Sequence, residues 1–566
     1  MDDGQIPRVV QLQVAFAGHA RPVDLGEDAE VLRRLRDVMA RLRAAGLRHA
    51  RLLTGLAGGA DQLAVQAWSA AAMGPVHAIL PFLDDGEELV GPTRLARTAT
   101  WLDGDHARAA GCNPHLAQAR WMLSHADLLI VVWNGQQGRG AGGTADAVRL
   151  ALEAGIPILW IDPHREEPHL IRRPSLYDPV GLLELREALR AGKDSIIAPA
   201  DLERLREALD LEPDASPNRH PPRPSERRLD AWLHRWLWRT FALFQRRVGG
   251  TLAEPVWEPA PPPADLASQP GFAAIRQAFE AADAHAGRLA AVHRSEQIIL
   301  LGAAVLAAMI GAVPFFDKDL KVPAIVAELI LASAAFLVWK TSARARWHEK
   351  WTSARRLAEH LRLAQAGWAL GVPTGRAGAA ALRQEHRRLG RATLRQAAPA
   401  EGRYDEARVS AWCGWAINEL VFGQADYHRR EGRRNHRIAH AVEWVENVSF
   451  AVLLLVLGTA TVTAAWAALV GGHAPFWATA TAGAVGVVVP AIGAAAMALE
   501  AKLQFEEQTE RSSVVAARLE DLARQLPGRL TLESAQAALR GAAEILVAEA
   551  DQWQEGGSRR RLFRGA

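Results

Sequence analysis

The sequence predicts two joined parts: a doubly wound parallel α/β sheet in the N-terminal domain, and an all-α membrane domain with four transmembrane helices and long cytoplasmic helices. Three observations predict this fold. Short apolar strands alternate with helical spacing in residues 10–165, glycine-rich loops follow three of the strands, and four long apolar runs lie between Ile298 and Leu499. A chain of 566 residues is also too long for one hydrophobic core.

Each strand of the predicted sheet is short and rich in β-branched or aliphatic residues. The expected strands are residues 11–17, 50–53, 75–80, 125–132 and 156–161. The fourth is apolar throughout its second half, as expected for a parallel strand that is buried on both faces. Between the strands, residues 30–45 have apolar side chains at helical spacing, and helices are also expected at residues 60–71 and up to Ala154.

Glycine-rich loops begin at the ends of three strands, at residues 18–22, 54–61 and 138–144. Ligands of such sheets bind at the carboxyl ends of the strands. Glycine allows the backbone to approach a phosphate closely, and a following helix offers free N–H groups and a partial positive charge. The three loops together predict a phosphate or nucleotide site.

The segments GHAR at 18–21, TGLAGGAD at 54–61 and VVWNGQQGRGAGGTAD at 131–146 resemble the SLOG superfamily, whose fold is Rossmann-like. That group includes the DNA-processing Smf proteins, the cytokinin-activating LOG enzymes and bacterial nucleotide sensors. The resemblance implies that eight residues line a nucleotide pocket: Gly18, Arg21, Gly58, Gly59, Asp61, Gly142, Gly143 and Thr144. The LOG enzymes follow a PGGxGT stretch with a catalytic glutamate. Here the loop reads AGGTADAV, so no enzyme and no catalytic residue is expected.

Five neighbouring residues complete the expected ligand site: His19, Gly55, Trp133, Asn134 and Gly135. His19 is either a turn residue or a base, and Trp133 either stacks on a base or belongs to the core. Asp61 and Asp146 either anchor the helix starts or hold a ribose hydroxyl. The segment HREEPH at 164–169 is expected to be an exposed loop because of Pro168.

Composition narrows the class of protein. The formal net charge of +3 is small for this length, so no nucleic-acid partner is expected. The two cysteines, Cys112 and Cys413, lie in different predicted domains and indicate neither a disulfide framework nor a metal site. The acidic, polar start lacks the features of a secretory signal, so the N-terminal domain is expected in the cytoplasm.

The apolar runs are long enough to span a bilayer. They are Ile298–Phe316, Val322–Trp339, Val448–Val470 and Ala474–Leu499. Glu328 lies inside the second run and costs roughly 2.5–3.5 kcal/mol if charged at mid-bilayer. The surrounding aliphatic residues outweigh this cost, so Glu328 should face protein or water and is the candidate pore residue. Arginine and lysine follow the second run and precede the third, which predicts cytoplasmic termini and a multi-pass membrane protein.

Proline-rich segments at 216–224 and 254–270 are expected linkers. Between them, residues 225–248 form an expected amphipathic helix that either faces a partner or lies in the membrane interface. The expected domains are therefore 1–215 for the sensor, 216–270 for the linkers and this helix, 271–400 for the first hairpin with its cytoplasmic helices, and 401–566 for the second with a basic tail.

The two hairpins resemble a degenerate repeat. Trp347, Glu349, Leu357, Ala358 and Leu361 follow the first at the spacings at which Phe505, Glu507, Val515, Ala516 and Leu519 follow the second. Residues 344–370 also resemble the helix after the hairpin in SLATT domains, which are membrane effectors of bacterial defence operons. This resemblance implies a role in antiphage immunity at the bacterial inner membrane. The expected ligand is a nucleotide second messenger made by a separate enzyme, either a cyclic oligonucleotide or an ADP-ribose derivative. Its binding is expected to open a homo-oligomeric pore, which causes abortive infection. The alternative is a membrane-tethered nucleotide-processing enzyme of the LOG type.

Overall fold

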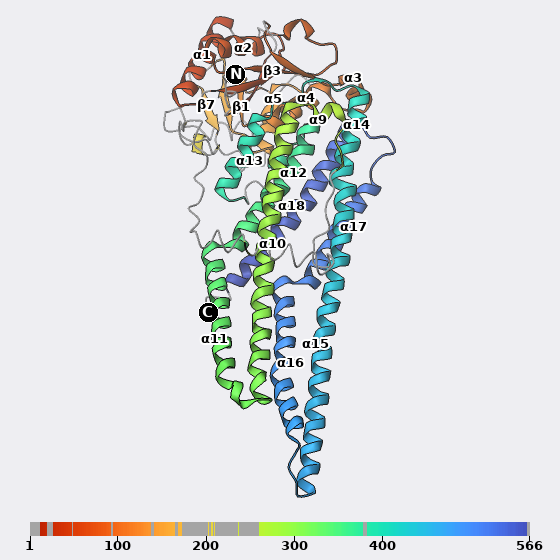
Figure 1. The fold of residues 1–566 in the computed structure, drawn as a ribbon. Coiled ribbons are helices and arrows are strands. Elements are labelled where there is room, and N and C mark those ends of the chain that lie inside the picture. Colours follow the sequence, from red (N-terminus) through yellow and green to blue (C-terminus); the bar gives the residue numbers. More distant parts are fainter. Residues whose placement is uncertain are drawn as a thin grey trace, which may run out of the picture.

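The computed structural model describes residues 12–19, 27–47, 49–91, 94–136, 141–164, 168–171, 260–376 and 382–562, together with Leu202, residues 205–207, Leu209 and Trp236. Residues 551–562 are described by their backbone alone. The molecule is elongated, with a sheet at one end and long helices running away from it (Figure 1). Arg21, the predicted linker 216–224 and nearly all of the predicted amphipathic helix 225–248 lie outside the described residues.

The N-terminal region contains an eight-stranded sheet in the order β7-β6-β5-β1-β2-β3-β4-β8. The strands are β1 (Leu12–Gly18), β2 (Ala50–Thr54), β3 (Val76–Leu80), β4 (Thr98–Trp101), β5 (Leu128–Val132), β6 (Ile158–Ile161), β7 (His169–Ile171) and β8 (Gly402–Arg403). Among these described strands, only the β6–β7 pair is antiparallel. The expected parallel sheet is confirmed in its coarse form: the sheet is mostly parallel, with one antiparallel edge strand.

Both edge strands, β7 and β8, the neighbouring strand β4 and one strand start differ from the sequence expectation. β4 and β8 are short and carry no apolar run, and β7 includes His169, which was expected in a loop. His125, expected at the start of a strand, is the last residue of helix α4 (Pro114–His125). A strand of two to four residues at a sheet edge has too few residues for an alternating pattern to be recognised.

Helices cover both faces of the sheet. Helices α1 (Asp28–Ala44) and α2 (Ala60–Ala70) pack on one face, in a core that includes Phe16, Leu52 and Ile130. Helices α4 and α5 (Thr144–Glu153) pack on the other. Two further helices, α3 (Gly104–Ala109) and α9 (Ala264–Ala267), are short, and α9 lies inside the predicted linker 254–270.

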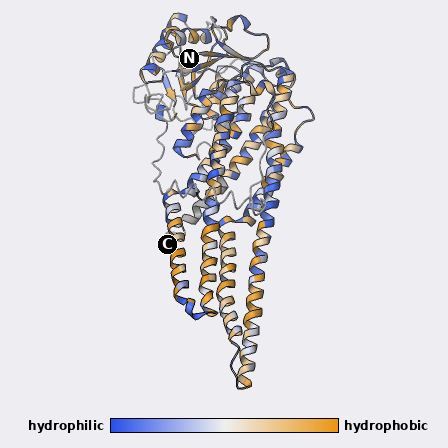
Figure 2. Ribbon diagram, viewed as in Figure 1, coloured by the Kyte–Doolittle hydropathy of each residue, from blue (hydrophilic) through white to orange (hydrophobic). Residues whose placement is uncertain are grey.

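The rest of the described chain is helical. Its elements are α10 (Pro270–Ala312), α11 (Lys321–Ala345), α12 (Trp347–Leu370), α13 (Gln384–Gln396), α14 (Glu406–Ile417), α15 (Gly423–Leu469), α16 (Phe476–Leu503), α17 (Phe505–Arg524) and α18 (Leu532–Leu562), with a π-helical turn at Asn418–Phe422. Four of these, α10, α11, α15 and α16, contain segments long and apolar enough to cross a membrane. Within the most apolar 18-residue stretch of each of these helices, at most 11% of the residues are buried. Figure 2 shows the apolar segments gathered at the end of the molecule away from the sheet.

The four apolar helices form a row and not a closed bundle. Helix α10 contacts both α11 and α16, and α16 also contacts α15. The order across the row is therefore α11–α10–α16–α15, as Figure 1 also shows. The two outer helices leave one flank each without a neighbour in the described part of the chain, and the row by itself encloses no channel.

The two hairpins are structural counterparts. Each ends in one residue with left-handed backbone, Arg346 (φ 51°, ψ 47°) after α11 and Gln504 (φ 51°, ψ 51°) after α16. A further helix follows in both cases, beginning with the buried aromatic residue Trp347 or Phe505. The apolar positions expected from the sequence repeat, Leu357 and Leu361 in α12 among them, are buried in both helices.

The sheet and the helical region share one core. Residues of β5, α4 and α5 belong to the same apolar cluster as residues of α10, α12, α14 and α18. Polar contacts reinforce this junction. The Gln13 amide donates to the carbonyl groups of Ala397 (3.0 Å) and Leu394 (3.1 Å), and Arg395 Nε lies 3.0 Å from Asp127 Oδ2. β8 then adds to the sheet edge beside β4. The segment between the two hairpins therefore packs against the sheet and adds one strand to it.

Candidate functional site

A cavity of about 430 Å³ lies at the carboxyl ends of β1, β2 and β5. The starts of α2 and α5 form two of its walls and α4 forms a third. Nine of the thirteen predicted ligand-site residues line it: Gly18, His19, Gly55, Asp61, Trp133, Asn134, Gly142, Gly143 and Thr144. The parallel topology brings these residues together from three separate loops.

The first loop is pressed against the start of α2. A Cβ on Gly18 would lie 2.5 Å from the Ala60 Cβ, so only glycine permits this approach. The backbone N–H of Ala60 donates to the His19 carbonyl at 3.1 Å. His19 also accepts at Nε2 from the backbone N–H of Asn134, at 3.3 Å. His19 therefore connects the first and third loops, as a turn residue does.

Asp61 holds the second loop in place. Its Oδ2 accepts from the Thr54 hydroxyl at 3.0 Å, and the backbone N–H groups of Gly55 and Ala57 also donate to this carboxyl. Burial raises the pKa of Asp61 to about 7, although these three hydrogen bonds act in the opposite direction. Asp61 lines the cavity with only 6% of its surface exposed, and its hydrogen bonds fix the shape of the second loop.

The third loop needs glycine at its turn. Gly142 has φ +85°, and a Cβ there would lie 2.7 Å from Asn113 Oδ1 and from the Leu116 backbone nitrogen. Its N–H donates to Asp146 Oδ2 at 2.7 Å, and Asp146 also pairs with Arg149 at 2.7 Å. Asp146 thus anchors the loop. Gly143 precedes α5 in extended backbone (φ −81°), and the first N–H groups of such a helix have no partner within it.

Trp133 is fully buried, and its indole N–H donates to the Gln136 carbonyl at 2.8 Å. Its own carbonyl accepts from the Trp160 indole at 2.7 Å. Trp133 is therefore a core residue beneath the cavity and presents no exposed ring face. Asn134 turns back on its own loop, because its Oδ1 accepts from the Gln136 N–H at 3.0 Å.

Three of the remaining predicted residues lie beside the cavity in sequence without lining it. Gly59 has φ +86° and immediately precedes α2, and Gly135 has φ +72°. Gly58 faces open space, with no atom within 4 Å of a Cβ built on it. Arg21 lies outside the described residues.

The α4 wall was not expected from the sequence. His115, Gln118, Ala119 and Met122 line the cavity from this helix. The start of α4 has a recognisable signal, because Asn113 caps it by accepting from the N–H groups of His115 and Leu116 and Pro114 follows at the first helical position. The amphipathic spacing is weak, however, since both faces of α4 are covered, one by the sheet and one by the helical region.

Glu328 lies in α11, half-exposed, and its carboxylate is directed at α10. Its Oε1 lies 2.4 Å from the position that a Cβ on Gly311 would take. The hydroxyl groups of Thr459, Thr461, Thr463 and Thr479 each donate to a carbonyl of their own helix. Within the described residues, no group of three or more His, Cys, Asp or Glu side chains is placed to hold a metal ion.

Comparison of the chain with protein-family models, with curated proteins and with solved structures finds no match.

Proposed function

We propose that this chain is a membrane effector of bacterial antiphage immunity. In this proposal the N-terminal region is a SLOG-type domain that binds a nucleotide second messenger, and the hairpins form a SLATT-like pore in the inner membrane. Binding opens or assembles the pore, and the loss of membrane integrity causes abortive infection.

The observation that carries the proposal is the cavity formed by three glycine-containing loops at one edge of a parallel sheet. Two helices, α2 and α5, begin at its walls, so backbone N–H groups and the positive ends of two helix dipoles are available to an anion. A volume of about 430 Å³ is in the range of small-ligand sites. A phosphate-bearing ligand fits this combination better than an apolar one.

Helix α4 provides a path from this cavity to the membrane helices. Its residues His115, Gln118 and Met122 line the cavity, while Trp121 packs against the opposite side, on Tyr404 and the end of α12. Helix α12 follows α11, one of the four apolar helices, after a single left-handed residue. A shift of α4 on ligand binding would therefore be transmitted to the base of the first hairpin.

The open row of apolar helices supports a homo-oligomer. Four helices in a row enclose no aqueous path, whereas several rows arranged around an axis do. A ligand changes the open–closed balance only by its difference in affinity for the two states. The expected assembly has both termini in the cytoplasm, because Lys340, Arg344 and Arg430 lie at the sheet-side ends of the hairpins.

The test is a leakage assay with purified full chain in dye-loaded liposomes. A cyclic dinucleotide, a cyclic trinucleotide and ADP-ribose are added separately, and one of them should release dye. ATP at equal concentration controls for charge, and protein-free liposomes control for direct membrane damage. The proposal fails if no ligand of the panel binds or if binding leaves the liposomes sealed.

A nucleotide-processing enzyme is the second candidate, and the observation that favours it is the buried Asp61, whose pKa burial raises to about 7. A carboxyl with such a pKa is suited to proton transfer near neutral pH. Chromatography of the same ligands after incubation with the protein separates the two functions. Release of a free base or of ribose phosphate would support the enzyme, and unchanged ligand would support the sensor.

A further inference from the structure

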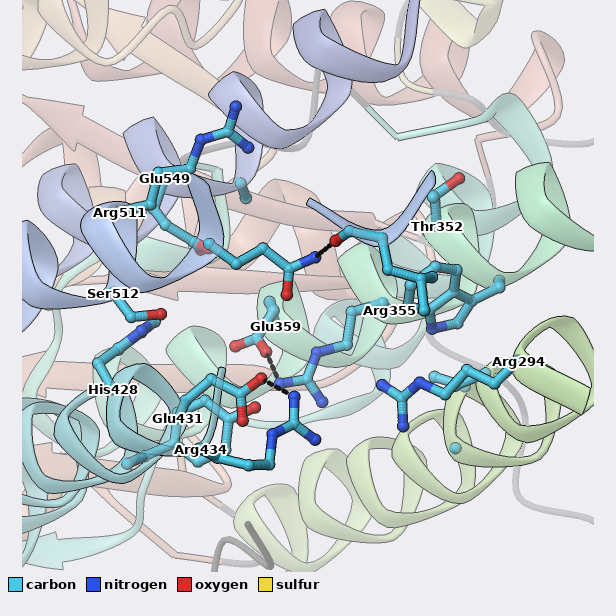
Figure 3. A pocket seen from close by; sticks show the side chains of 18 of the residues that line it. Arg294, Thr352, Arg355, Glu359, His428, Glu431, Arg434, Arg511, Ser512 and Glu549 are labelled. Atoms are coloured by element: carbon cyan, nitrogen blue, oxygen red, sulfur yellow. Dashed lines mark hydrogen bonds and ion pairs between the residues drawn. The ribbon is translucent and has the colours of Figure 1, made fainter. Parts of the chain in front are cut away.

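A second cavity, of about 250 Å³, lies in the helical region between the two repeats (Figure 3). Helices α10 and α12 of the first repeat form one side, and α15, α16 and α17 of the second repeat, with α18, form the other. It shares no lining residue with the cavity at the sheet.

Arginine side chains from both repeats converge on this cavity. Arg294 of α10, Arg355 of α12 and Arg434 of α15 project into it from three helices (Figure 3). Arg356 and Arg511 also line it, against four carboxylates. Burial, with the neighbouring Glu359 carboxylate, raises the pKa of one of the four, Glu549, to about 7, which reduces its negative charge near neutral pH. The lining therefore carries an excess of positive charge.

The arginines are held at the wall mainly by carboxylates of their own helices. Arg355 lies 2.7 Å from Glu359 one turn away and 3.1 Å from Asp283 of α10. Arg434 pairs with Glu431, and Arg511 pairs with Glu507, again within one helix turn. A guanidinium group has five N–H donors in a planar fork, so a side chain oriented in this way can also donate to an oxyanion.

Two buried, uncharged polar side chains also line the cavity. Gln424 is 1% exposed and His428 is 7% exposed, and both line the cavity. Among the described residues, neither Gln424 Nε2 nor His428 Nδ1 has a hydrogen-bond partner. Burial lowers the pKa of His428 to about 4, so its ring is neutral near pH 7 and has one N–H to donate. Gln424 Nε2 is a donor whichever tautomer His428 adopts, and buried donors normally have partners, so it can donate to an oxyanion inside the cavity.

Part of the cavity lining is apolar and comes from α10, α15, α16 and the start of α17. It is formed by Ile298, Ile438, Leu499, Leu503 and Phe505. Ile298 and Leu499 are the outermost residues of the first and fourth apolar runs. The cavity lining thus combines guanidinium groups with aliphatic side chains, two of which are the first and last residues of membrane-length apolar runs.

We propose that this cavity binds a phosphate group, carried either by an anionic phospholipid headgroup or by a soluble phosphate. Basic pockets between membrane helices on the cytoplasmic side bind anionic headgroups in this way. Since the arginines come from both repeats, the bound anion would bridge the two hairpins and oppose their separation. The inference requires the four apolar helices but not a nucleotide in the sheet cavity.

The test uses the purified full chain in a neutral detergent and three probes: dioctanoyl-phosphatidylglycerol, dioctanoyl-phosphatidylcholine and inorganic phosphate at constant ionic strength. Binding is followed by thermal shift and by tryptophan fluorescence, since Trp351 lines the cavity. Arg294→Gln should weaken binding by at least about tenfold, because one charge-assisted contact is lost. Arg288→Gln is the matched control, an exposed arginine of the same helix outside the cavity.

A second variant keeps the test independent of charge. Gly287 lies at the cavity, and no atom is within 4 Å of a Cβ built on it. Gly287→Leu should therefore fill part of the cavity without disturbing α10 and should also weaken binding.

Binding of phosphatidylglycerol alone would identify a lipid, and equal binding of inorganic phosphate would identify a soluble anion. The proposal is overturned if no probe binds the wild type, or if Arg294→Gln and Gly287→Leu both bind like wild type.

Discussion

Trp121 and Gly371 are in direct contact across the junction between the sheet and the helical region. Trp121 lies on α4, and Gly371 is the first residue after α12, with φ +64°. A Cβ on Gly371 would lie 2.2 Å from Trp121 Cε3. The Tyr404 ring packs on the same indole, with 4.6 Å between centroids, and its hydroxyl donates to the Ala369 carbonyl at 2.8 Å. The end of α12 is therefore held directly by the helix that lines the sheet cavity.

Gly371→Ala should destabilise the protein more than Gly155→Ala. Both glycines follow a helix with left-handed backbone (φ +64° and +66°), but a Cβ on Gly155 meets no atom within 4 Å. Gly155→Ala should cost about 1–2 kcal/mol for the backbone alone, and Gly371→Ala about 1–3 kcal/mol more for the clash. Thermal unfolding in detergent measures both. Equal losses would mean that the Trp121 contact is not tight.

Gly143→Glu should abolish nucleotide binding without unfolding the protein. Gly143 has φ −81°, so glutamate is unstrained there, and its carboxylate would occupy the start of α5 and repel a phosphate. Gly58→Glu should act similarly, because Gly58 lies two residues before α2, and a Cβ there faces open space and so tolerates the side chain. Gly59 is unsuitable because its φ of +86° would strain any other residue. Calorimetry with the nucleotide that binds wild type is the measurement, with Gly528→Glu as the open-space control. Unchanged affinity would place the ligand elsewhere.

Asp61 should make the protein less stable as the pH rises from about 4 to about 7. Its folded-state pKa of about 7 lies above the ordinary value of 3.8, so in this window the unfolded chain loses the proton while the folded protein retains it. The loss is on the order of 4 kcal/mol when complete. As the pH rises through this window, the Tm of wild type should fall relative to the Tm of Asp61→Asn. Above about pH 7 the difference between the two Tm values should stay constant. A constant difference would show that Asp61 ionises normally.

Topology is testable with single cysteines in a Cys112→Ser background, because Cys413 is buried. An impermeant maleimide added to intact cells should label Asp319→Cys and Gly472→Cys, which lie in the two short loops. Arg344→Cys and Arg430→Cys should be labelled only after the cells are opened. These two sites are exposed, whereas Arg355 and Arg434 face the arginine-lined cavity. Labelling of Arg344→Cys from outside would contradict cytoplasmic termini.

Glu328→Gln tests whether the carboxylate belongs to a conducting path. If it does, the substitution should change cation preference in liposome-flux recordings while ligand affinity stays the same. Its position against Gly311 also fits a packing role between α10 and α11. In that case Glu328→Gln should conduct like wild type, and Gly311→Leu should separate the two helices and lower the Tm.

The candidate site was predictable as a set of loops but not as an enclosed volume. Gly18, Asp61 and Gly143 are recognisable because phosphate-binding loops require glycine at strand ends and because helices start there. The α4 wall, with His115 and Gln118, has no comparable pattern, since a helix covered on both faces has no clear polar side. The sequence allowed two roles for Trp133, stacking on a base or packing in the core. Its full burial in the structure shows that it is a core residue.

The local sequence pattern was sufficient to predict the central strands β1, β2, β3, β5 and β6, the four apolar helices and the repeat of the helices that follow them. A strand buried on both faces is a short apolar run, and a membrane-length helix is a long one, so both can be recognised from composition. Tertiary structure decided what joins them. β8 pairs with β4 three hundred residues away in the chain, Arg395 meets Asp127, and arginines of two repeats converge on one cavity. Such contacts depend on how distant segments pack, and each partner by itself is an ordinary polar or charged residue. The local periodicity of the sequence does not indicate which distant segment each of these residues will contact.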